Sequence, residues 1–374
     1  MRVLHVHSGN LFGGVERILE TLAEASDACA GMETSAALCS DGRLGDQLTA
    51  AGATVHRLGS VRASRPWQVA LARRALTRTL TANRPHVAVV HSDWSHALFG
   101  NTIRSAGVPL VRWMHAAEPG PAWQAWGAER AVPALVICNS RYTCRGSQGR
   151  FAGTPRAVCY APVVFRRADR DVARAAADLA PSTVVILLAA RFEACKGHLV
   201  LLKALALLRD VGGWEAWIVG GPQRDEERRR LGDLVRGAAA AGLSERVRFL
   251  GERGDVQSLM AAADIYCQPN EGPESYGMSF VEAMGAGLPV VSTDLGALPE
   301  VVDETCGVLV RPGDAQAISG ALRQLIEDPV GRRELSRGAQ ARAAALGDPD
   351  ARFRDLTDAF RSVLDEPLPR GSVA

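Results

Sequence analysis

The chain has 374 residues, of which 47% are hydrophobic and 22% are charged, and its mean hydropathy is close to zero. This balance excludes a disordered or fibrous protein, and the length suits two domains of ordinary size. The net charge of +2 hides an asymmetry, because residues 1–165 hold 17 arginines and 10 acidic residues and therefore carry +7, whereas the remainder carries −5.

The first half alternates short apolar runs, typical of buried strands, with amphipathic helical patterns. A strand candidate over 2–8 is followed by Gly13-Gly14 and by apolar residues at helical spacing. Further strand candidates lie at 35–39, 55–58, 87–91, 110–114, 135–138 and 158–162, separated by helical patterns such as 66–83 and 95–105. This alternation predicts a parallel sheet with helices on both faces.

The alternation pauses at a helical stretch over 165–180 and then restarts. Strand candidates follow at 184–190, 216–220, 247–250, 265–268, 289–292 and 308–310, and helix candidates at 199–209, 226–241, 256–263, 280–285, 315–327, 331–344 and 350–365. We therefore predict an α/β protein with two Rossmann-like domains, residues 1–164 and 165–345, facing across a cleft. A terminal helix and tail, 346–374, is expected to return to the N-terminal domain.

Two glycine-containing turns follow predicted strands, at the sheet edge where such folds bind ligands. Gly13-Gly14 opens a helix and offers free amides to an anion, although a plain tight turn explains it equally well. In the second half, Arg191 and Lys196 precede Gly197 and a helix, a spacing at which two cations can bracket a diphosphate. Of the 43 basic residues only Lys196 and Lys203 are lysines. Lys196 therefore suggests a site at which the ligand is bound by a compact point charge. Lys203 is expected on an exposed helix face.

A third segment, from Glu271 to Pro289, combines carboxylates with a helix start. Glu274 and Glu282 stand eight positions apart, so both could reach one elongated ligand. Carboxylates accept hydrogen bonds from hydroxyls, whereas helix amides suit phosphate. The segment therefore predicts a ligand that contains both sugar and phosphate.

In this order the motifs resemble those of the family-four glycosyltransferases, which are retaining enzymes of the GT-B fold. The resemblance spans nearly the whole chain, through Gly13-Gly14-Val15-Glu16, Arg191-x4-Lys196-Gly197, Glu274-x7-Glu282, Leu298-Pro-Glu300 and the segment from Gly307 to Gly313. It implies transfer of a sugar from a UDP- or GDP-sugar to an acceptor hydroxyl with an α-linkage, in cell-surface glycan, glycolipid or secondary-metabolite biosynthesis. A sugar-nucleotide epimerase of the same fold and a non-catalytic nucleotide-sugar-binding protein are the alternatives.

The same resemblance implies roles for individual residues. Arg191 and Lys196 would neutralise the leaving diphosphate, Glu274 would bind hydroxyls of the donor sugar, and His115 would lie near the reacting sugar. Further donor-binding residues would be Gly14, Arg253, Tyr276, Gly277, Met278 and Glu282, with Glu282 on the ribose and the segment ending at Arg253 along the base. Cations and amides would stabilise the departing charge, so no metal and no cofactor is expected. Two Asp-x-Asp triplets, at 169–171 and 348–350, are expected to cap helices instead of binding metal.

The resemblance also implies that the first domain, which is the arginine-rich one, receives the acceptor, expected to be a small molecule, a glycan or a lipid-linked molecule. Seven arginines and no acidic residue lie between Asp46 and Asp93. A peripheral membrane contact through the Arg57–Arg84 region and an ordinary solvated helix explain this equally well. For the membrane contact, the helix over 66–83 would supply arginines beside apolar residues, namely Arg73, Arg74, Arg78, Trp67, Val69, Leu71, Leu76 and Leu80. Candidates for lining the acceptor are Trp94, Trp123 and Trp126, although tryptophan also fills cores.

Other features concern partners and location. The longest apolar run, 184–190, is far shorter than the ~20 residues that cross a bilayer, and the eight cysteines form no CxxC pair. We expect a cytoplasmic protein, with the inner membrane face as an alternative site. The mixed-sign run over 225–230 predicts a solvated helix face and gives no case for nucleic acid.

Overall fold

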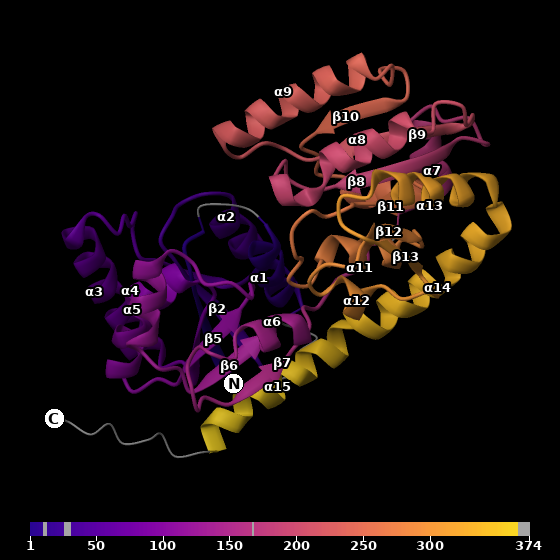
Figure 1. The fold of residues 1–374 in the computed structure, drawn as a ribbon. Coiled ribbons are helices and arrows are strands. Elements are labelled where there is room, and N and C mark those ends of the chain that lie inside the picture. Colours follow the sequence, from indigo (N-terminus) through magenta and orange to yellow (C-terminus); the bar gives the residue numbers. More distant parts are fainter. Residues whose placement is uncertain (10–12, 26–30, 167, 366–374) are drawn as a thin grey trace. The chain divides into compact units, whose positions relative to one another are not determined.

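The computed structural model of the protein describes residues 1–9, 13–25, 31–166 and 168–365. The chain divides into two compact units (Figure 1). The N-terminal unit comprises residues 1–163 and 348–374, and the C-terminal unit comprises residues 164–347. The sequence predicted domains over 1–164 and 165–345 and a terminal segment over 346–374, so each observed limit differs from the expected one by one or two residues.

The N-terminal unit is built on a seven-stranded parallel sheet of order β3-β2-β1-β4-β5-β6-β7. Its strands are β1 (Arg2–His7), β2 (Glu33–Leu38), β3 (Thr54–Arg57), β4 (Val87–Val90), β5 (Leu110–Met114), β6 (Leu135–Cys138) and β7 (Arg156–Val158). Its helices are α1 (Gly14–Glu24), α2 (Arg43–Ala50), α3 (Pro66–Asn83), α4 (Asp93–Ser105), α5 (Ala122–Glu129), α6 (Arg141–Gly146) and α15 (Pro349–Asp365). Helix α4 packs against both α3 and α5, and α1 packs against α2.

The C-terminal unit is built on a six-stranded parallel sheet of order β10-β9-β8-β11-β12-β13. Its strands are β8 (Val184–Ala189), β9 (Trp214–Val219), β10 (Val247–Gly251), β11 (Ile265–Cys267), β12 (Val290–Thr293) and β13 (Gly307–Val310). Its helices are α7 (Arg170–Ala176), the 3-10 turn η1 (Ala194–Lys196), α8 (His198–Ala206), α9 (Asp225–Ala240), α10 (Val256–Ala262), α11 (Met278–Gly285), α12 (Leu298–Val301), α13 (Ala315–Glu327) and α14 (Pro329–Gly347). Helix α8 packs against α9 and α13, and α11 packs against α14.

Buried apolar strands form the centre of both parallel sheets. The central strands β4 and β8 are apolar along their whole length, and β4 is completely buried, as expected when helices cover both faces of a parallel sheet. Large apolar clusters fill the space between sheet and helices in each unit. The predicted pair of Rossmann-like α/β domains is thereby confirmed.

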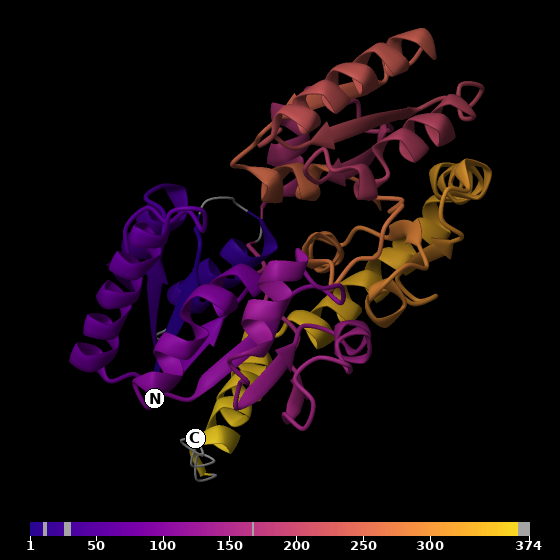
Figure 2. The same ribbon diagram turned by 60° about the vertical axis from the view of Figure 1, so that its left-hand side comes forward.

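Helix α15 belongs to the N-terminal unit, beside which both ribbon views place it (Figures 1 and 2). The Arg352 guanidinium lies 5.9 Å from the ring centre of Tyr160, and the Cys159 thiol donates to the Asp355 carbonyl oxygen over 3.8 Å. The expected return of the terminal helix is therefore observed.

Some elements differ from the sequence prediction. Strand β7 occupies 156–158 instead of 158–162, and only residues 170–176 of the predicted helical stretch over 165–180 are helical. The sequence pattern did not indicate the short helices α2, α5, α6 and α12. In the described part of the chain, no helix is both long enough and apolar enough to cross a membrane. Seven cysteines are free thiols, and Cys29 lies outside the described residues.

Candidate functional site

The turn that follows β8 carries the predicted cations of the C-terminal unit. After η1 the backbone passes through Gly197, whose φ is 72°, into α8. A Cβ atom on Gly197 would lie 1.7 Å from the carbonyl oxygen of Pro269, so the turn touches the segment that follows β11. Only glycine fits both this conformation and this contact, and the contact sets Lys196 against a second loop of the same unit.

Lys196 is engaged by Glu274. Its Nζ atom donates to Glu274 Oε2 over 2.7 Å, and the two side chains are 21% and 14% exposed. Burial by itself lowers the pKa of Lys196, but the charge and hydrogen bond of Glu274 outweigh burial and leave the pKa above its usual value. The sequence assigned both residues to one ligand; the structure brings them together as partners of each other.

A chain of buried polar groups stands behind Glu274. Asn270 Nδ2 donates to Glu274 Oε2 over 3.2 Å, Gln268 Nε2 donates to Asn270 Oδ1 over 2.8 Å, and the Tyr266 hydroxyl donates to Gln268 Oε1 over 2.8 Å. The side chains of Asn270, Gln268 and Tyr266 are almost completely buried. Such a connected network fixes the position of the Glu274 carboxylate at its end. Sequence reasoning missed them, although polar residues at 266, 268 and 270 have the spacing of one strand face.

The start of α11 lies beside Glu274. Its N-cap residue, Gly277, has a φ of 89°, and a Cβ atom there would lie 3.2 Å from Glu274 Cγ. Among the described residues, the amides of Met278 and Ser279 have no intrahelical acceptor, and the positive end of the helix dipole lies here. Burial raises the pKa of Tyr266, and the nearby Glu282 and Glu274 carboxylates raise it further. The carboxyl edge of this sheet thus gathers Lys196, Glu274, Glu282 and the start of α11, and Tyr276 is buried there.

Arg191 lies between two carboxylates. It forms an ion pair with Glu193, and its Nη1 atom is 3.7 Å from Glu227 Oε1. Glu227 is only 3% exposed and accepts a hydrogen bond from the Gln223 amide over 2.7 Å. The prediction of a solvated face over 225–230 is therefore wrong at Glu227. That residue continues the inward stripe of α9, which includes Leu234 and Ala238, so helical periodicity could have revealed it.

Arg253 stands apart from this cluster. It follows β10 and forms two hydrogen bonds with Asp255, of 2.8 and 2.6 Å, with 43% of its side chain exposed. Within the described residues no contact joins Arg253 to Lys196 or Glu274. Its role along a nucleotide base stays a prediction.

In the N-terminal unit, Glu16 closes the glycine turn before α1. Its Oε2 atom accepts from the Gly13 amide over 2.9 Å, and its Oε1 atom lies 2.7 Å from His7 Nε2. Burial raises the pKa of Glu16, but the hydrogen bond and charge of His7 outweigh burial and leave the pKa below its usual value. A Cβ atom on Gly14 would meet no described atom within 4 Å. A side chain at this position would therefore meet no described neighbour.

His115 ends a row of three imidazoles. His5 Nδ1 lies 2.9 Å from His91 Nε2, and His91 Nδ1 lies 2.9 Å from His115 Nε2. Trp113 is buried beside them, with its ring 5.4 Å from that of His115. Burial lowers the pKa of His5 to about 3 and the pKa of His91 and His115 well below the usual value. His5 and His91 were missed by the sequence analysis, although histidines in or after neighbouring strands are a usable signal.

The candidate acceptor tryptophans occupy different surroundings. Trp94 packs against the core of the N-terminal unit, edge-on to Phe99 with ring centres 6.1 Å apart. Trp123 and Trp126, both on α5, are 47% and 63% exposed. The Arg130 guanidinium lies 4.6 Å from the ring centre of Trp126. Exposure thus leaves Trp123 and Trp126 available to a ligand.

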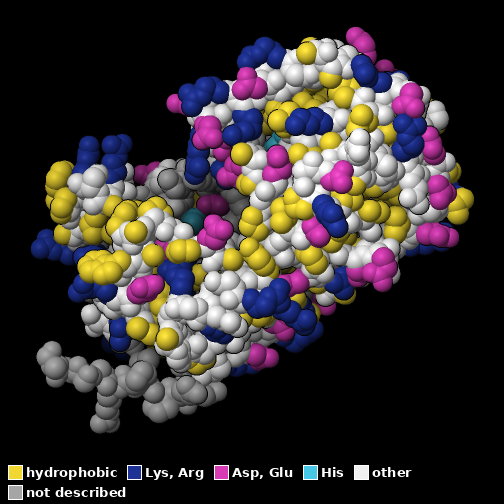
Figure 3. Space-filling view, viewed as in Figure 1, with side chains coloured by type: hydrophobic (Ala, Val, Ile, Leu, Met, Phe, Trp, Pro, Cys, Tyr) yellow, Lys and Arg dark blue, Asp and Glu magenta, His cyan; other side chains and the backbone are white. Residues whose placement is uncertain are grey.

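The predicted membrane-facing apolar set on α3 is partly wrong. Val69, Leu76 and Leu80 are buried in the core, because they lie on the inward stripe of the helix. Trp67 and Leu71 are 61% and 60% exposed. Figure 3 shows hydrophobic side chains beside arginine side chains over the α3–α5 part of the unit.

Two arginines of the Arg57–Arg84 region are engaged within the unit. Arg57 forms an ion pair with Asp41 and lies 3.7 Å from Asp46, and Arg73 Nε donates to the Leu98 carbonyl oxygen over 2.7 Å. Both nevertheless remain exposed, as do Arg62, Arg65, Arg74, Arg78 and Arg84. The basic surface suggested by the sequence is therefore present, with two of its arginines held by partners within the unit.

Both Asp-x-Asp triplets cap helices, as predicted. Asp169 accepts hydrogen bonds from the amides of Asp171 and Val172 over 2.9 and 3.0 Å, and Asp348 accepts from the Asp350 amide over 3.1 Å. Among the described residues, no group of three or more His, Cys, Asp or Glu side chains is arranged to hold a metal ion.

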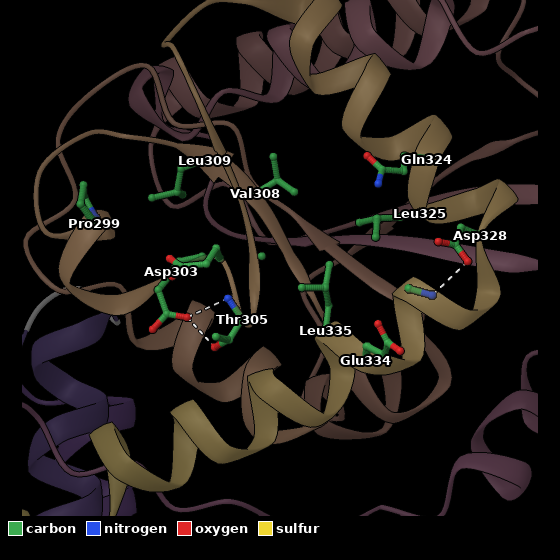
Figure 4. Close-up of a pocket in the computed structure, with 14 residues that line it drawn as sticks. Pro299, Asp303, Thr305, Val308, Leu309, Gln324, Leu325, Asp328, Glu334 and Leu335 are labelled. Carbon is green, nitrogen blue, oxygen red and sulfur yellow. Dashed lines mark hydrogen bonds between the residues drawn. The ribbon is translucent and has the colours of Figure 1, made fainter.

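A cavity of about 960 Å³ lies between α12, β13, α13 and α14 (Figure 4). Val308, Leu309 and Leu325 form part of its apolar wall, and Asp328 caps α14 at one end. Its described lining has four carboxylates, no lysine or arginine, and none of the predicted site residues. This chemistry does not suit a diphosphate, so the cluster at the carboxyl edge remains the candidate site.

Known families match both halves of the chain. The family described as Glycosyl transferases group 1 matches residues 183–328, and the Glycosyl transferase 4-like domain matches residues 13–176. The first match lies entirely within the C-terminal unit, whereas the second covers most of the N-terminal unit and continues to the end of α7 in the C-terminal unit.

Several relatives share these features. A D-inositol 3-phosphate glycosyltransferase from Saccharomonospora viridis is 31% identical over 75% of this chain and 70% of its own length. A phosphatidyl-myo-inositol mannosyltransferase from Mycobacterium leprae is 42% identical, but over only 40% of this chain and 39% of its own length. Among solved structures, Anabaena HepE in complex with UDP and glucose has a TM-score of 0.85 and 24% identity, covering 97% of this chain and all of that one. At this identity the likeness shows the fold.

Proposed function

Because the chain belongs to the group 1 glycosyl transferases and is thus a glycosyltransferase of the GT-B fold, we propose that it transfers a sugar with retention from a nucleoside-diphosphate sugar to an acceptor hydroxyl. The product would carry an α-linkage. The observation that carries this proposal is the cluster at the carboxyl edge of the C-terminal sheet, where Lys196, Glu274 and the start of α11 meet. A fixed cation and unpaired helix amides suit a diphosphate, and a carboxylate suits sugar hydroxyls. Cell-surface glycan, glycolipid or secondary-metabolite biosynthesis is the proposed setting.

In this reaction the bond from the anomeric carbon to the diphosphate oxygen breaks, and the acceptor oxygen bonds to that carbon on the same face. The acceptor proton passes to the departing diphosphate. Arg191, Lys196 and the amides of Gly277 and Met278 stabilise the charge that develops there. These groups do the work that a metal ion does in other transferases, so the proposed mechanism needs neither metal nor cofactor.

The remaining donor contacts are assigned by the same logic. Glu274 takes hydroxyls of the donor sugar and Glu282 takes those of the ribose, whose base lies toward Arg253. The amide of Gly14 is proposed to meet the phosphate, because it opens α1 and the positive end of a helix dipole favours an anion. HepE was solved with UDP-glucose, which supports a UDP-sugar; a GDP-sugar is the second candidate.

The acceptor is proposed to bind the N-terminal unit and to carry an anionic group. Two relatives are named for inositol 3-phosphate and phosphatidyl-myo-inositol, and the arginine excess of residues 1–165 suits such acceptors. Trp123 and Trp126 offer exposed ring faces to it. A cytoplasmic place of action fits a nucleotide-sugar donor.

A peripheral membrane contact through α3 is a second proposal on the same unit. It rests on exposed Trp67 and Leu71 beside Arg74 and Arg78, a pattern that suits an anionic membrane surface. The protein should sediment with anionic liposomes but not with neutral ones, and replacing Arg74 and Arg78 by Glu should abolish sedimentation. Binding that is absent, or unchanged in this variant, contradicts the contact.

Two lysines make a direct test of the donor site. We would expose the protein to formaldehyde and cyanoborohydride with UDP, GDP or ADP and follow methylation of Lys196 and Lys203 by mass spectrometry. The accepted nucleotide should slow methylation of Lys196 by about tenfold at near-saturating concentration, while exposed Lys203 serves as the internal control. Equal rates with and without every nucleotide would contradict the site.

The reaction class is tested with the sugar donors of the nucleotide that protects Lys196. Transfer releases nucleoside diphosphate only when an acceptor is present, and the anomeric configuration of the product is determined by NMR. An epimer that appears from the donor alone would instead indicate the epimerase. Protection of Lys196 without any turnover would favour the non-catalytic binder.

A further inference from the structure

Three histidines form a continuous row across neighbouring strands of the N-terminal sheet. His5 lies in β1, His91 directly follows β4, and His115 directly follows β5; β4 is hydrogen-bonded to both other strands. The two inter-ring N···N distances are both 2.9 Å, within the range for hydrogen bonds. Each inter-ring bond therefore needs one proton between two ring nitrogens.

Counting protons leaves only two arrangements. Three neutral imidazoles carry three N–H groups, and two of these are used between the rings. The third proton must then sit at an end of the row, either on His115 Nδ1 or on His5 Nε2. In the first arrangement every N–H points toward His115, and in the second every N–H points toward His5. Burial keeps the pKa of all three histidines far enough below neutrality for the neutral forms to prevail.

The two ends of the row differ in their surroundings. His5 Nε2 is enclosed and has no hydrogen-bond partner among the described residues, whereas His115 is partly exposed. A proton on His5 Nε2 would be a buried, unpaired N–H donor, which folded proteins avoid more strictly than an unfilled acceptor. A proton on His115 Nδ1 can be donated to water or to a ligand. Aligned N–H dipoles also place the positive end of the row at His115, which suits an oxygen-rich anionic ligand.

We propose that His5 and His91 hold His115 in the tautomer protonated on Nδ1, so that His115 offers the substrate a neutral hydrogen-bond donor and not a base. His5 and His91 are then positioning residues that act through His115. The part concerning substrate rests on the proposed function, because His115 must face the transferred sugar. The tautomer itself is a property of the free protein.

The tautomer is read directly by NMR. In protein with 15N-labelled histidine at pH 7.5, long-range 1H–15N correlations distinguish protonated from unprotonated ring nitrogens. His5, His91 and His115 should all carry the proton on Nδ1, and single substitutions assign them among the eight histidines of the chain. A proton on Nε2 of His115 overturns the proposal, whatever reaction the enzyme catalyses.

Two isosteric variants separate positioning from packing. In His91→Asn the side-chain amide can still donate to His115 Nε2, whereas in His91→Asp the carboxylate can only accept and draws the proton of His115 to Nε2. We expect kcat/KM of the Asp variant to be at least about tenfold below that of the Asn variant, since a wrong histidine tautomer is costly. The His115 signals should change to protonated Nε2 in the Asp variant alone.

Equal kcat/KM in two folded variants overturns the proposal, because a role in packing alone would affect both alike. If the Asp variant does not fold, the wild-type spectrum still decides. If the wild type transfers no sugar from any donor, the proposed function fails, and the spectrum tests the tautomer independently.

Discussion

Lys196 gives the sharpest prediction at the scale of single residues. Replacing it by alanine removes the cation that faces the proposed leaving group, while Asn270 still donates to Glu274. We expect kcat/KM to fall at least about a hundredfold, with cooperative thermal unfolding retained. Arg191→Ala and Glu274→Ala should behave alike in the same steady-state assay.

Lys203 provides the matched control. It is the other lysine of the chain, lies exposed on α8 of the same unit, and should tolerate alanine with kcat/KM unchanged. Near-normal turnover in any two of the three site variants would remove the assignment of the site.

Residue types at strand ends made part of this site predictable. Lys196 stands out as one of only two lysines among the 43 basic residues, and Glu274 and Glu282 stand out because they lie eight positions apart around a helix start. Their partners were harder to predict, because Lys196 and Glu274 are 78 positions apart and no local pattern links them. Glu227 was misassigned for a different reason: its neighbours are charged, and the run of charge masked the inward stripe of α9.

At the scale of elements, Gly197 tests how closely the turn after β8 approaches the loop after β11. Alanine at this position combines a positive φ with a Cβ atom 1.7 Å from the Pro269 carbonyl oxygen, so the turn must move. We expect a loss of more than about 1 kcal/mol in the free energy of unfolding, measured by urea titration. Nucleotide protection of Lys196 should weaken in parallel.

Gly237 is the control for this substitution. It is exposed within α9, and a Cβ atom there meets nothing within 4 Å. Gly237→Ala should therefore stabilise the protein by about 0.5 to 1 kcal/mol, as alanine does inside helices. A Gly197→Ala variant as stable as the wild type would contradict the close approach.

The accuracy of the predicted elements followed burial. Strands β4, β5 and β6 are wholly buried and, apart from Arg112 in β5, apolar, so their runs stand out from the flanking sequence. Strand β7 lies at the sheet edge with partly exposed residues, and its prediction was shifted. The helix α5 exposes two tryptophans and buries Ala128 alone, so it lacks the apolar stripe by which a helix is recognised.

At the scale of the whole molecule, the two units differ in how they carry charge. The C-terminal unit pairs its site cations with carboxylates, as at Lys196 and Arg191. The N-terminal unit also buries an ion-pair cluster, of Asp93 with Arg112 and Arg150, but in addition it buries neutral imidazoles and exposes arginines on α3. Sequence composition predicted the arginine excess but not the buried histidines, since burial of a polar residue depends on tertiary contacts.

This difference predicts that acid unfolds the N-terminal unit first. Burial lowers the pKa of His5 and His96 to about 3 and that of His91 and His115 well below the usual value, whereas His198, lowered to about 4, lies in the C-terminal unit. Between pH 6.5 and about 4 the unfolded chain binds protons that the folded units cannot. The free energy of unfolding therefore falls as pH falls, by up to about 1.4 kcal/mol per pH unit for each buried imidazole.

The N-terminal unit holds four of these buried imidazoles and the C-terminal unit holds one. Over this pH range the free energy of unfolding of the N-terminal unit should therefore fall by several kcal/mol more than that of the C-terminal unit. This loss is comparable to the whole stability of a domain, about 5 to 15 kcal/mol. Hydrogen exchange with mass spectrometry, corrected for intrinsic rates, should show β1, β4 and β5 losing protection near pH 5 while β8 and β9 keep theirs. In His96→Gln one titrating group is absent. The slope of the free energy of unfolding against pH should therefore decrease by the equivalent of about one proton. If the C-terminal unit instead loses protection at a higher pH than the N-terminal unit, the buried imidazoles do not decide which unit unfolds first in acid.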